Sequence, residues 1–241
     1  MKLYSRRYLP ILTYHKLSTT DRDRFTVSST QFERQLAYLR NQGYQSIRFS
    51  DLLRSDLQWP GPHSILITFD DGYLSFSRIA VPLLERYGFT ATCFVPVGHI
   101  GGQNEWDGGG TPLMSEQDLR ALPPSLVELG LHSWNHANYN SLGRDQIRQD
   151  VERCRLRLGE LGIRHAPVLA YPYGGVPKTS EQRKQWGDTL AQAGVRLACR
   201  VGNQLNQFPV QDPWMLTRTD IRGDESHWKF VIKVKLGRCK L

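Results

Sequence analysis

Apolar, β-branched runs alternate with amphipathic helical patterns along most of the chain, and this feature restricts the possible folds more than any other. Strand-like runs include residues 64–69, "SILITF", and residues 89–97, "FTATCFVPV". The clearest helix covers residues 145–161, where apolar side chains recur at intervals of four and three. Repeated strand–helix units predict an α/β fold with a mainly parallel sheet. About seven such units in 241 residues favour a closed barrel over an open sheet.

The composition is that of an ordinary globular protein, with 39% hydrophobic and 22% charged residues, which excludes a disordered chain. We interpret residues 1–241 as one domain with a glycine-rich insertion at 98–112. This insertion is either a mobile lid around Trp106 or a tolerated surface loop. No apolar run is long enough to span a membrane, and the basic start has no cleavage site of a leader. We therefore expect a cytoplasmic protein, or an exported one whose leader has been removed.

The net charge of +8 is compatible with anionic partners but does not identify one, and we expect no nucleic-acid partner. The densest basic segment is residues 229–241, with five cations and no acid. We expect a half-buried strand with a solvated lysine face there, and weak association with a membrane surface is the alternative. Four cysteines lie far apart without a CxxC pair, which argues against a disulfide scaffold. The oligomeric state is not predictable from these features.

Three local predictions concern the first third of the chain. Residues 8–14, "YLPILTY", have the pattern of one strand. Thr30 and Glu33 have the spacing of a capping box at the start of a helix that ends near Gly43. Ser50 is placed to cap the brief helix that follows it.

Polar side chains follow several of the predicted strands at the point where each strand ends. In parallel α/β folds the carboxyl ends of the strands meet on one rim, where chemistry collects. The sequence therefore predicts one shared site. It would contain His15 after the first strand, Asp70 and Asp71 after residues 64–69, His132 and His136 after the strand ending at Leu131, and Tyr173 after the strand ending near Ala170.

The residue types on this rim are those of a catalytic metal site. A His-x-x-x-His spacing puts His132 and His136 on one side of a helical turn, where the imidazoles can share an ion. One carboxylate would complete a three-residue set and leave positions open for water and substrate. The second carboxylate could then accept a proton from that water. The alternative is that Asp70-Asp71-Gly72 forms an ordinary polar turn.

With these residues identified, the sequence resembles the polysaccharide deacetylases, the NodB-homology family of carbohydrate esterases. "TFDDG" at 68–72 matches the first motif of that family, "HSWNH" at 132–136 matches its second, and "YPYG" at 171–174 matches the end of its third. "ILTYHKLS" and "TPLMSEQDLRAL" are similar to the branch that acts on exopolysaccharides and surface glycans. The resemblance covers roughly residues 9–222.

The resemblance implies a distorted (β/α) barrel and metal-dependent removal of an acetyl group, usually from an N-acetylated sugar. The metal of the family is usually zinc. By position, Asp71, His132 and His136 would hold it and Asp70 would be the general base. The tetrahedral oxyanion would be stabilised by the metal and by the backbone N–H of Tyr173.

Two departures from the family pattern leave roles open. The family's third motif usually begins with an arginine that pairs with the catalytic aspartate, and Ala170 occupies that position here. Arg218 is a candidate substitute, with a surface arginine as the alternative. The family's late general-acid histidine is not evident, because only His227 lies so near the end. His15 is the better candidate, against a purely hydrogen-bonding role.

Two alternative functions remain compatible with these features. An O-deacetylase or another amide hydrolase would keep the fold and change the bond that is cleaved. A catalytically silent sugar-binding protein is the alternative from another class, although such a protein has no evident use for two adjacent aspartates. Trp106, Trp134 and Tyr139 are candidate apolar platforms for a sugar ring.

Overall fold

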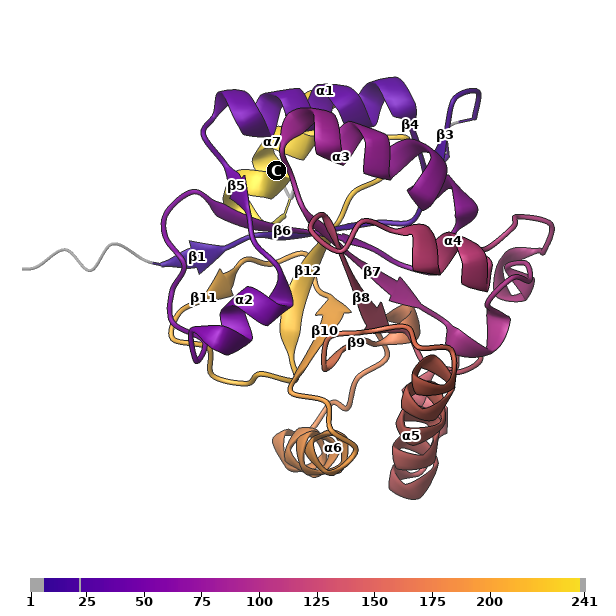
Figure 1. The fold of residues 1–241 in the computed structure, drawn as a ribbon. Helices are drawn as coiled ribbons and strands as arrows, with labels where there is room; N and C mark the ends of the chain where they lie inside the picture. The colour runs from indigo at the N-terminus through magenta and orange to yellow at the C-terminus, as the bar shows by residue number, and fades with distance from the viewer. Residues whose placement is uncertain (1–6, 22, 239–241) are drawn as a thin grey trace, which may run out of the picture.

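Seven parallel strands close into a barrel in the computed structural model, which describes residues 7–21 and 23–238 (Figure 1). Closure occurs because the first of these strands pairs with both the last and the second. The predicted barrel of about seven strands is therefore confirmed. In spatial order the strands are β2 (Ile11–Tyr14), β6 (Ser64–Phe69), β7 (Ala91–Val95), β8 (Val127–Leu131), β9 (Val168–Ala170), β10 (Leu197–Val201) and β12 (Leu216–Asp220).

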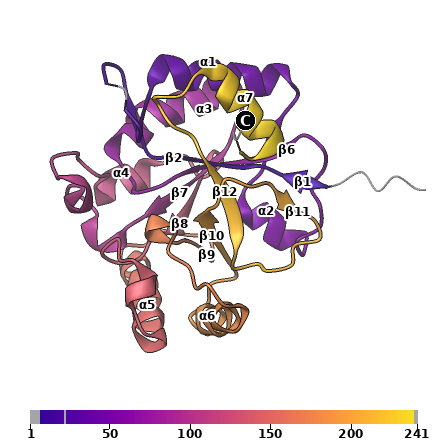
Figure 2. The ribbon, with the colours of Figure 1, turned by 180° about the vertical axis from the view of Figure 1, so that it is seen from behind.

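Helices surround the barrel and connect its strands (Figures 1 and 2). The α-helices are α1 (Ser29–Asn41), α2 (Phe49–Arg54), α3 (Val81–Tyr87), α4 (Glu116–Ala121), α5 (Arg144–Glu160), α6 (Ser180–Gln192) and α7 (His227–Leu236). Short 3₁₀ turns occupy Val97–His99, Glu105–Asp107, Tyr139–Ser141 and Pro172–Gly174, and a π-helical turn, Phe76–Ala80, leads into α3. Outside the barrel, β1 (Tyr8–Leu9) pairs with β11 (Asn206–Gln207), and β3 (Lys16–Ser18) pairs with β4 (Thr26–Ser28). The short strand β5 (Gln45–Ser46) pairs in parallel with the start of β6.

The barrel interior is built in layers, because alternate residues of a strand point to the same side. An apolar lower layer contains Ile11, Leu66 and Leu216, and α2 covers it through Phe49 and Leu52. The middle layer is mixed and contains Thr13, Thr68, Phe94, Ala170, Cys199 and Arg218, all fully buried. The next inward positions along the strands therefore form the uppermost layer, at the carboxyl rim.

The barrel is uneven around its circumference. β8 and β9 pair only at Leu131 and Leu169, so the two strands separate toward their amino ends. A cavity of about 640 Å³ lies below this separation, between α4 and the segment 162–167. None of the predicted site residues lines it, so the chemistry predicted from the sequence belongs to the other end of the barrel.

Three local predictions need correction. Residues 8–14 are not one strand: Pro10 separates β1 from β2, since proline cannot donate to a ladder. α1 begins one residue before Thr30, and its cap is Ser28, whose hydroxyl accepts a hydrogen bond from the N–H of Gln31. Ser50 lies inside α2, where the Asp51 carboxylate accepts from the N–H of Arg48 instead.

The predicted C-terminal strand is wrong: the segment forms α7. Its β-branched residues favoured a strand, but Phe230 and Val234 are four residues apart and both are buried in the core beside α1. Gly237 ends the helix in the left-handed conformation, with φ +76°. Tertiary packing therefore overrides local propensity here. Cys239, at the end of this segment, lies outside the described residues, and the other three cysteines are buried free thiols.

Candidate active site

The carboxyl rim of the barrel surrounds a cavity of about 300 Å³. All six residues that the sequence predicted for a shared site line it: His15, Asp70, Asp71, His132, His136 and Tyr173. His15, Asp70 and His132 follow the inward positions of β2, β6 and β8, so they continue the layering of the barrel interior. The structure thus brings the predicted residues together, while their roles remain predictions.

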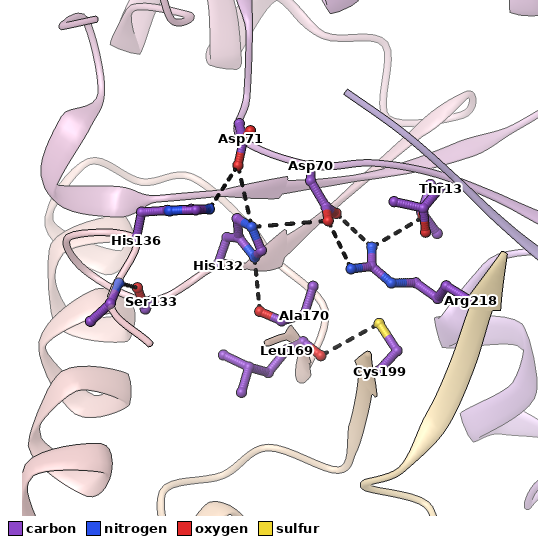
Figure 3. Close-up of polar contacts among 12 residues, drawn as sticks. Thr13, Asp70, Asp71, His132, Ser133, His136, Leu169, Ala170, Cys199 and Arg218 are labelled. Atoms are coloured by element: carbon purple, nitrogen blue, oxygen red, sulfur yellow. Dashed lines mark hydrogen bonds and ion pairs between the residues drawn. The ribbon is translucent and has the colours of Figure 1, made fainter. Parts of the chain in front are cut away.

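The turn after β6 separates the two adjacent carboxylates. Asp70 still continues the strand, and its N–H donates to the carbonyl of Tyr14 at 2.9 Å. Asp71 and Gly72 then both adopt left-handed backbone conformations, with φ of +70° and +66°. Glycine adopts this conformation freely and aspartate tolerates it, which explains the Asp-Gly pair. As a result Asp70 points into the barrel and Asp71 points toward the histidines (Figure 3).

Asp71, His132 and His136 converge on one point. The Oδ1 atom of Asp71 lies 3.3 Å from Nε2 of His132 and 3.2 Å from Nε2 of His136 (Figure 3). All three side chains are buried, and one ligand atom from each lies within 4.8 Å of the others. Two imidazole nitrogens and a carboxylate oxygen are a usual ligand set for a divalent transition metal.

The orientation of His132 is fixed from the opposite side of its ring. Its Nδ1 atom lies 2.8 Å from the carbonyl oxygen of Ala170. A carbonyl can only accept, so Nδ1 carries a proton, and in the neutral imidazole Nε2 keeps the lone pair that a metal ion would bind. Such a contact orients a metal-binding imidazole and makes it more basic.

The two histidines are not on a helical turn, so the predicted conformation of this segment is wrong. Ser133 and His136 both have left-handed backbones, with φ of +61° and +52°. The loop is held by α5, because Asp150 accepts a hydrogen bond from the N–H of Trp134 at 3.0 Å. Ser133 also accepts from the N–H of Ala137 at 2.8 Å. The imidazoles converge because this loop folds back on itself.

Arg218 forms a bidentate ion pair with Asp70. Its two terminal nitrogens donate to the two carboxylate oxygens, at 2.5 and 2.7 Å (Figure 3). Arg218 comes from β12 and has no exposed surface, so it is not a surface arginine. One of these nitrogens also donates to the hydroxyl of Thr68 at 3.3 Å. Arg218 therefore supplies the cation that is missing at Ala170.

The electrostatics of the site follow from burial opposed by charge. Burial raises the pKa of Asp70, but Arg218 and then His132 lower it by more, so the net shift is downward. Burial also raises the pKa of Asp71, and the two imidazoles lower it well below its usual range. For His132, burial lowers the pKa and the two aspartates raise it by more. Both carboxylates are thus held ionised, and together they favour positive charge beside them.

The residues fit a metal ion. Arg218 balances the charge of Asp70, which leaves the buried charge of Asp71 facing two imidazoles. Among the described residues, no hydrogen bond reaches the Oδ1 atom of Asp71, although that atom is buried. A buried carboxylate oxygen without a hydrogen bond is costly, and a cation shared with the two Nε2 atoms would satisfy it.

The other cavity residues surround this centre. His15 contacts the ring of Phe25 edge-on, with ring centroids 5.5 Å apart. Tyr173 is 63% exposed, has a left-handed backbone, and meets the ring of His136 edge-on. Trp106, from the glycine-rich segment 98–112, stacks on His136 with ring centroids 4.4 Å apart. This segment therefore reaches over the site and is not a remote surface insertion.

Other predicted residues lie elsewhere. Tyr139 is fully buried and donates a hydrogen bond to Asp150. The guanidinium of Arg153 lies 3.7 Å from the ring centre of Trp134. Neither aromatic residue lines the cavity, so neither is a sugar platform there. His227 packs against Tyr38 and Phe230 and is also absent from the cavity.

Several cavity residues were not predicted. They are Arg24, Phe25, Tyr73, Asp107, Tyr171, Gly174, Val201 and Asp220. Val201 and Asp220 end β10 and β12 on the inward side, so the strand-end argument could have found them. Arg24 and Phe25 lie in the connection between β3 and β4. No pattern in the sequence predicts that this connection reaches the site.

Comparison with known proteins gives the family. The family model described as polysaccharide deacetylase matches residues 59–191, more than half of the chain. The chain belongs to the polysaccharide deacetylase family. The matched residues include Asp70, Asp71, His132, His136 and Tyr173, whereas His15 and Arg218 lie outside them.

The individual family members that match this chain are distant from it in sequence. YxkH of Bacillus subtilis (strain 168), named as a polysaccharide deacetylase, is 26% identical over 168 residues, which are 69% of this chain and 57% of YxkH. The poly-β-1,6-N-acetyl-D-glucosamine N-deacetylase of Staphylococcus aureus (strain MRSA252) is 23% identical over 177 residues, or 69% of this chain and 60% of that enzyme. The chain thus spans about three fifths of the length of these curated relatives.

A solved structure supports the fold independently. The deacetylase PplD of Streptococcus pyogenes, solved in complex with acetate, superposes with a TM-score of 0.78 at 19% identity. The match covers 95% of this chain and 99% of PplD. At this identity the likeness establishes the barrel and no more.

Proposed function

We propose that this chain is a metal-dependent hydrolase that removes the acetyl group from an N-acetylated sugar, an N-acetylhexosamine in a glycan. One observation carries the proposal: Asp71, His132 and His136 converge on a point beside Asp70, which Arg218 holds ionised at the floor of a rim cavity. A binding protein without chemistry does not need a buried carboxylate placed next to a candidate metal site. The S. aureus relative, an N-deacetylase by name, supports the choice of an N-acetyl group.

Asp71, His132 and His136 would hold the ion, and we propose zinc because two imidazoles and one carboxylate suit it. When bound, the ion would polarise the acetyl carbonyl and lower the pKa of a water molecule. Ala170 would keep Nε2 of His132 available through its contact with Nδ1.

Asp70 would accept the proton of the attacking water. Its carboxylate is buried and ionised, and Arg218 fixes its orientation through both oxygens. The bidentate contact makes Asp70 a weaker base than a free carboxylate, but it keeps the base form populated throughout the neutral range.

His15 and Tyr173 would act on the other parts of the reaction. His15 lines the cavity from the end of β2, where it could protonate the leaving amine. Tyr173 follows β9 and lines the same cavity as His15. Its backbone N–H could donate to the developing oxyanion. The exposed ring of Tyr173, beside Trp106, offers an apolar wall for a sugar.

Metal analysis combined with acetate release tests this function. The purified protein should contain about one zinc ion per chain, and both Asp71→Ala and His136→Ala should lose it. Asp70→Asn should keep the ion and lose acetate release from N-acetylglucosamine oligomers. Leu156→Ser, an exposed change on α5, is the matched control and should alter neither quantity.

Three outcomes would contradict the proposal. Activity on O-acetylated but not on N-acetylated sugars would change the bond that is cleaved. Metal binding without hydrolysis across a broad panel of glycans would indicate a binding protein. Full activity in Asp70→Asn would remove Asp70 as the base.

A further inference from the structure

The C-terminal helix α7 carries apolar side chains on the face that it turns to solvent. Phe230 and Val234 are buried against the core, as expected for a surface helix. On the opposite side Trp228 is 49% exposed and Leu236 is 65% exposed, and Ile232 between them is partly exposed. Spacings of four residues place Trp228, Ile232 and Leu236 in one stripe, which we call the α7 stripe. A surface helix normally presents polar residues to solvent. An exposed apolar stripe such as the α7 stripe is typical of a surface that binds a partner.

Basic residues border the α7 stripe. At 3.6 residues per turn, Lys229 lies on one border and Lys235 on the other. Arg238, exposed just beyond the helix, adds a third cation. Residues 227–238 contain no aspartate or glutamate. The surface that covers the stripe must therefore accept both apolar side chains and a basic border.

The charge pattern decides between possible occupants. A second copy of this chain, docked through the same face, would place these cations opposite one another, and like charges across an interface are costly. An anionic lipid surface complements both features: tryptophan, isoleucine and leucine enter the boundary below the headgroups, and lysine and arginine contact the phosphates. We propose that α7 docks this protein on an anionic lipid surface through the α7 stripe and its basic border.

The position of α7 connects this surface with the candidate active site. α7 packs beside α1 and follows directly on the loop after β12 (Figures 1 and 2). A cavity of about 440 Å³ adjoins the candidate site and shares Arg24 and Asp220 with it. The wall of this second cavity includes Lys233 and Arg238. α7 therefore borders a cavity that adjoins the candidate site, and this contact is the structural link between the proposed docking helix and the site.

Co-sedimentation with lipid vesicles tests the proposal. The full chain should sediment with vesicles of equal parts phosphatidylcholine and phosphatidylglycerol, and much less with pure phosphatidylcholine. Trp228→Ser combined with Leu236→Ser should lower the partition coefficient about tenfold or more, since both side chains lose their apolar contact with lipid. Lys229→Gln combined with Lys235→Gln should lower it by about tenfold, because each lysine near an anionic surface contributes to binding.

Matched variants separate this surface from general stickiness. Leu156→Ser on α5 removes an equally exposed leucine, 68% against 65%, and should leave the partition coefficient unchanged. Lys184→Gln, exposed on α6, is the control for charge. Because the substituted side chains are exposed or partly exposed, the variants should keep the circular dichroism spectrum of the parent, which the experiment records.

Three results would overturn the proposal. The first is no sedimentation with the anionic vesicles. The second is sedimentation that survives Trp228→Ser with Leu236→Ser and is matched by binding to soluble heparin, which would indicate a basic patch for polyanions in general. The third is a dimer, measured by light scattering, that the same double variant dissociates, which would make the stripe a protein interface.

Discussion

The guanidinium of Arg218 contacts both carboxylate oxygens of Asp70, at 2.5 and 2.7 Å, although the two residues are 148 positions apart in the sequence. The pair lies inside the barrel, and Arg218 has no exposed surface. Bidentate arginine–carboxylate contacts fix orientation as well as charge. In this molecule the last strand of the barrel therefore orients the carboxylate that follows its second strand.

Removing Arg218 should destabilise the fold strongly. Arg218→Met leaves the carboxylate of Asp70 buried without its cation, and breaking a buried pair in this way costs about 3–5 kcal/mol. Urea unfolding of the parent, Arg218→Met, Asp70→Asn and the double variant forms a complete cycle. The double variant should be more stable than the sum of the single losses predicts. A loss below about 1 kcal/mol in Arg218→Met, typical of an exposed pair, would contradict this account.

Zinc should stabilise the protein through Asp71, His132 and His136. A ligand that binds only the folded state adds about 2.7 kcal/mol at a hundredfold excess over its dissociation constant. A chelator should therefore lower the melting temperature of the zinc-loaded protein. Asp71→Ala should melt at the same temperature with and without the chelator, because it has lost a ligand. An equal response of both proteins would show that the ion binds elsewhere.

Strand ends predict the site residues correctly where the sheet alone decides the geometry. His15, Asp70 and His132 occupy the next inward position after β2, β6 and β8, so period-two alternation is sufficient to bring them together. From the sequence, Arg218 was only a candidate partner for Asp70. Which buried side chains pair depends on which strands lie near one another in the barrel. β12 pairs with β2 only when the barrel closes.

Features that depend on backbone geometry and on long-range packing were not predicted correctly from the sequence. The approach of His136 to His132 was assigned to a helical turn, whereas two left-handed residues and the contact with Asp150 produce it. Spacing alone does not distinguish these conformations. α7 was expected to be a strand, because packing against α1 is not visible in local propensity.

His15 should affect turnover without affecting the metal. His15→Ala removes the proposed proton donor from the cavity wall, and a missing general acid costs about a hundredfold or more in kcat. The zinc content should remain that of the parent, because His15 is not among the three converging side chains that we propose as metal ligands. His63→Ala, a change in a distant loop, is the control. Unchanged kcat in His15→Ala would remove this residue from the mechanism.

Trp106 should support the metal site and the substrate wall together. Its ring stacks on His136 at an interplanar angle of 19° and also contacts His99 edge-on. Trp106→Ala should weaken zinc affinity by about tenfold, as expected when the outer contact of a ligand is lost. It should also raise KM for N-acetylglucosamine oligomers.

Trp106→Phe should recover most of both effects, because a smaller ring can still stack on the imidazole. Titration with a competing zinc chelator and steady-state kinetics give the two quantities. If Trp106→Ala changes KM alone, the ring contacts substrate without supporting His136.

Asp23 should make the wall of the cavity sensitive to acid. Its carboxylate accepts hydrogen bonds from the N–H groups of Phe25 and Thr26, at 2.6 and 2.7 Å, and from the hydroxyl of Thr26 at 3.0 Å. Burial raises the pKa of Asp23, but these donors lower it by more. A carboxyl group whose pKa is lowered on folding contributes its full stabilisation at pH values above its ordinary pKa. This stabilisation is lost as the pH falls through the lowered pKa of the folded state.

The segment that contains Phe25 should therefore loosen only at pH values below the ordinary pKa of an aspartate. In an acid titration followed by NMR, the amide signals of Phe25 and Thr26 should move together at that low pH. Asp23→Asn removes the titrating group, so the same signals should stay constant. Because Phe25 lines the cavity and contacts His15, Asp23→Asn should also raise KM modestly at neutral pH. Amide signals that titrate within the ordinary range would show that the backbone donors do not hold Asp23 ionised.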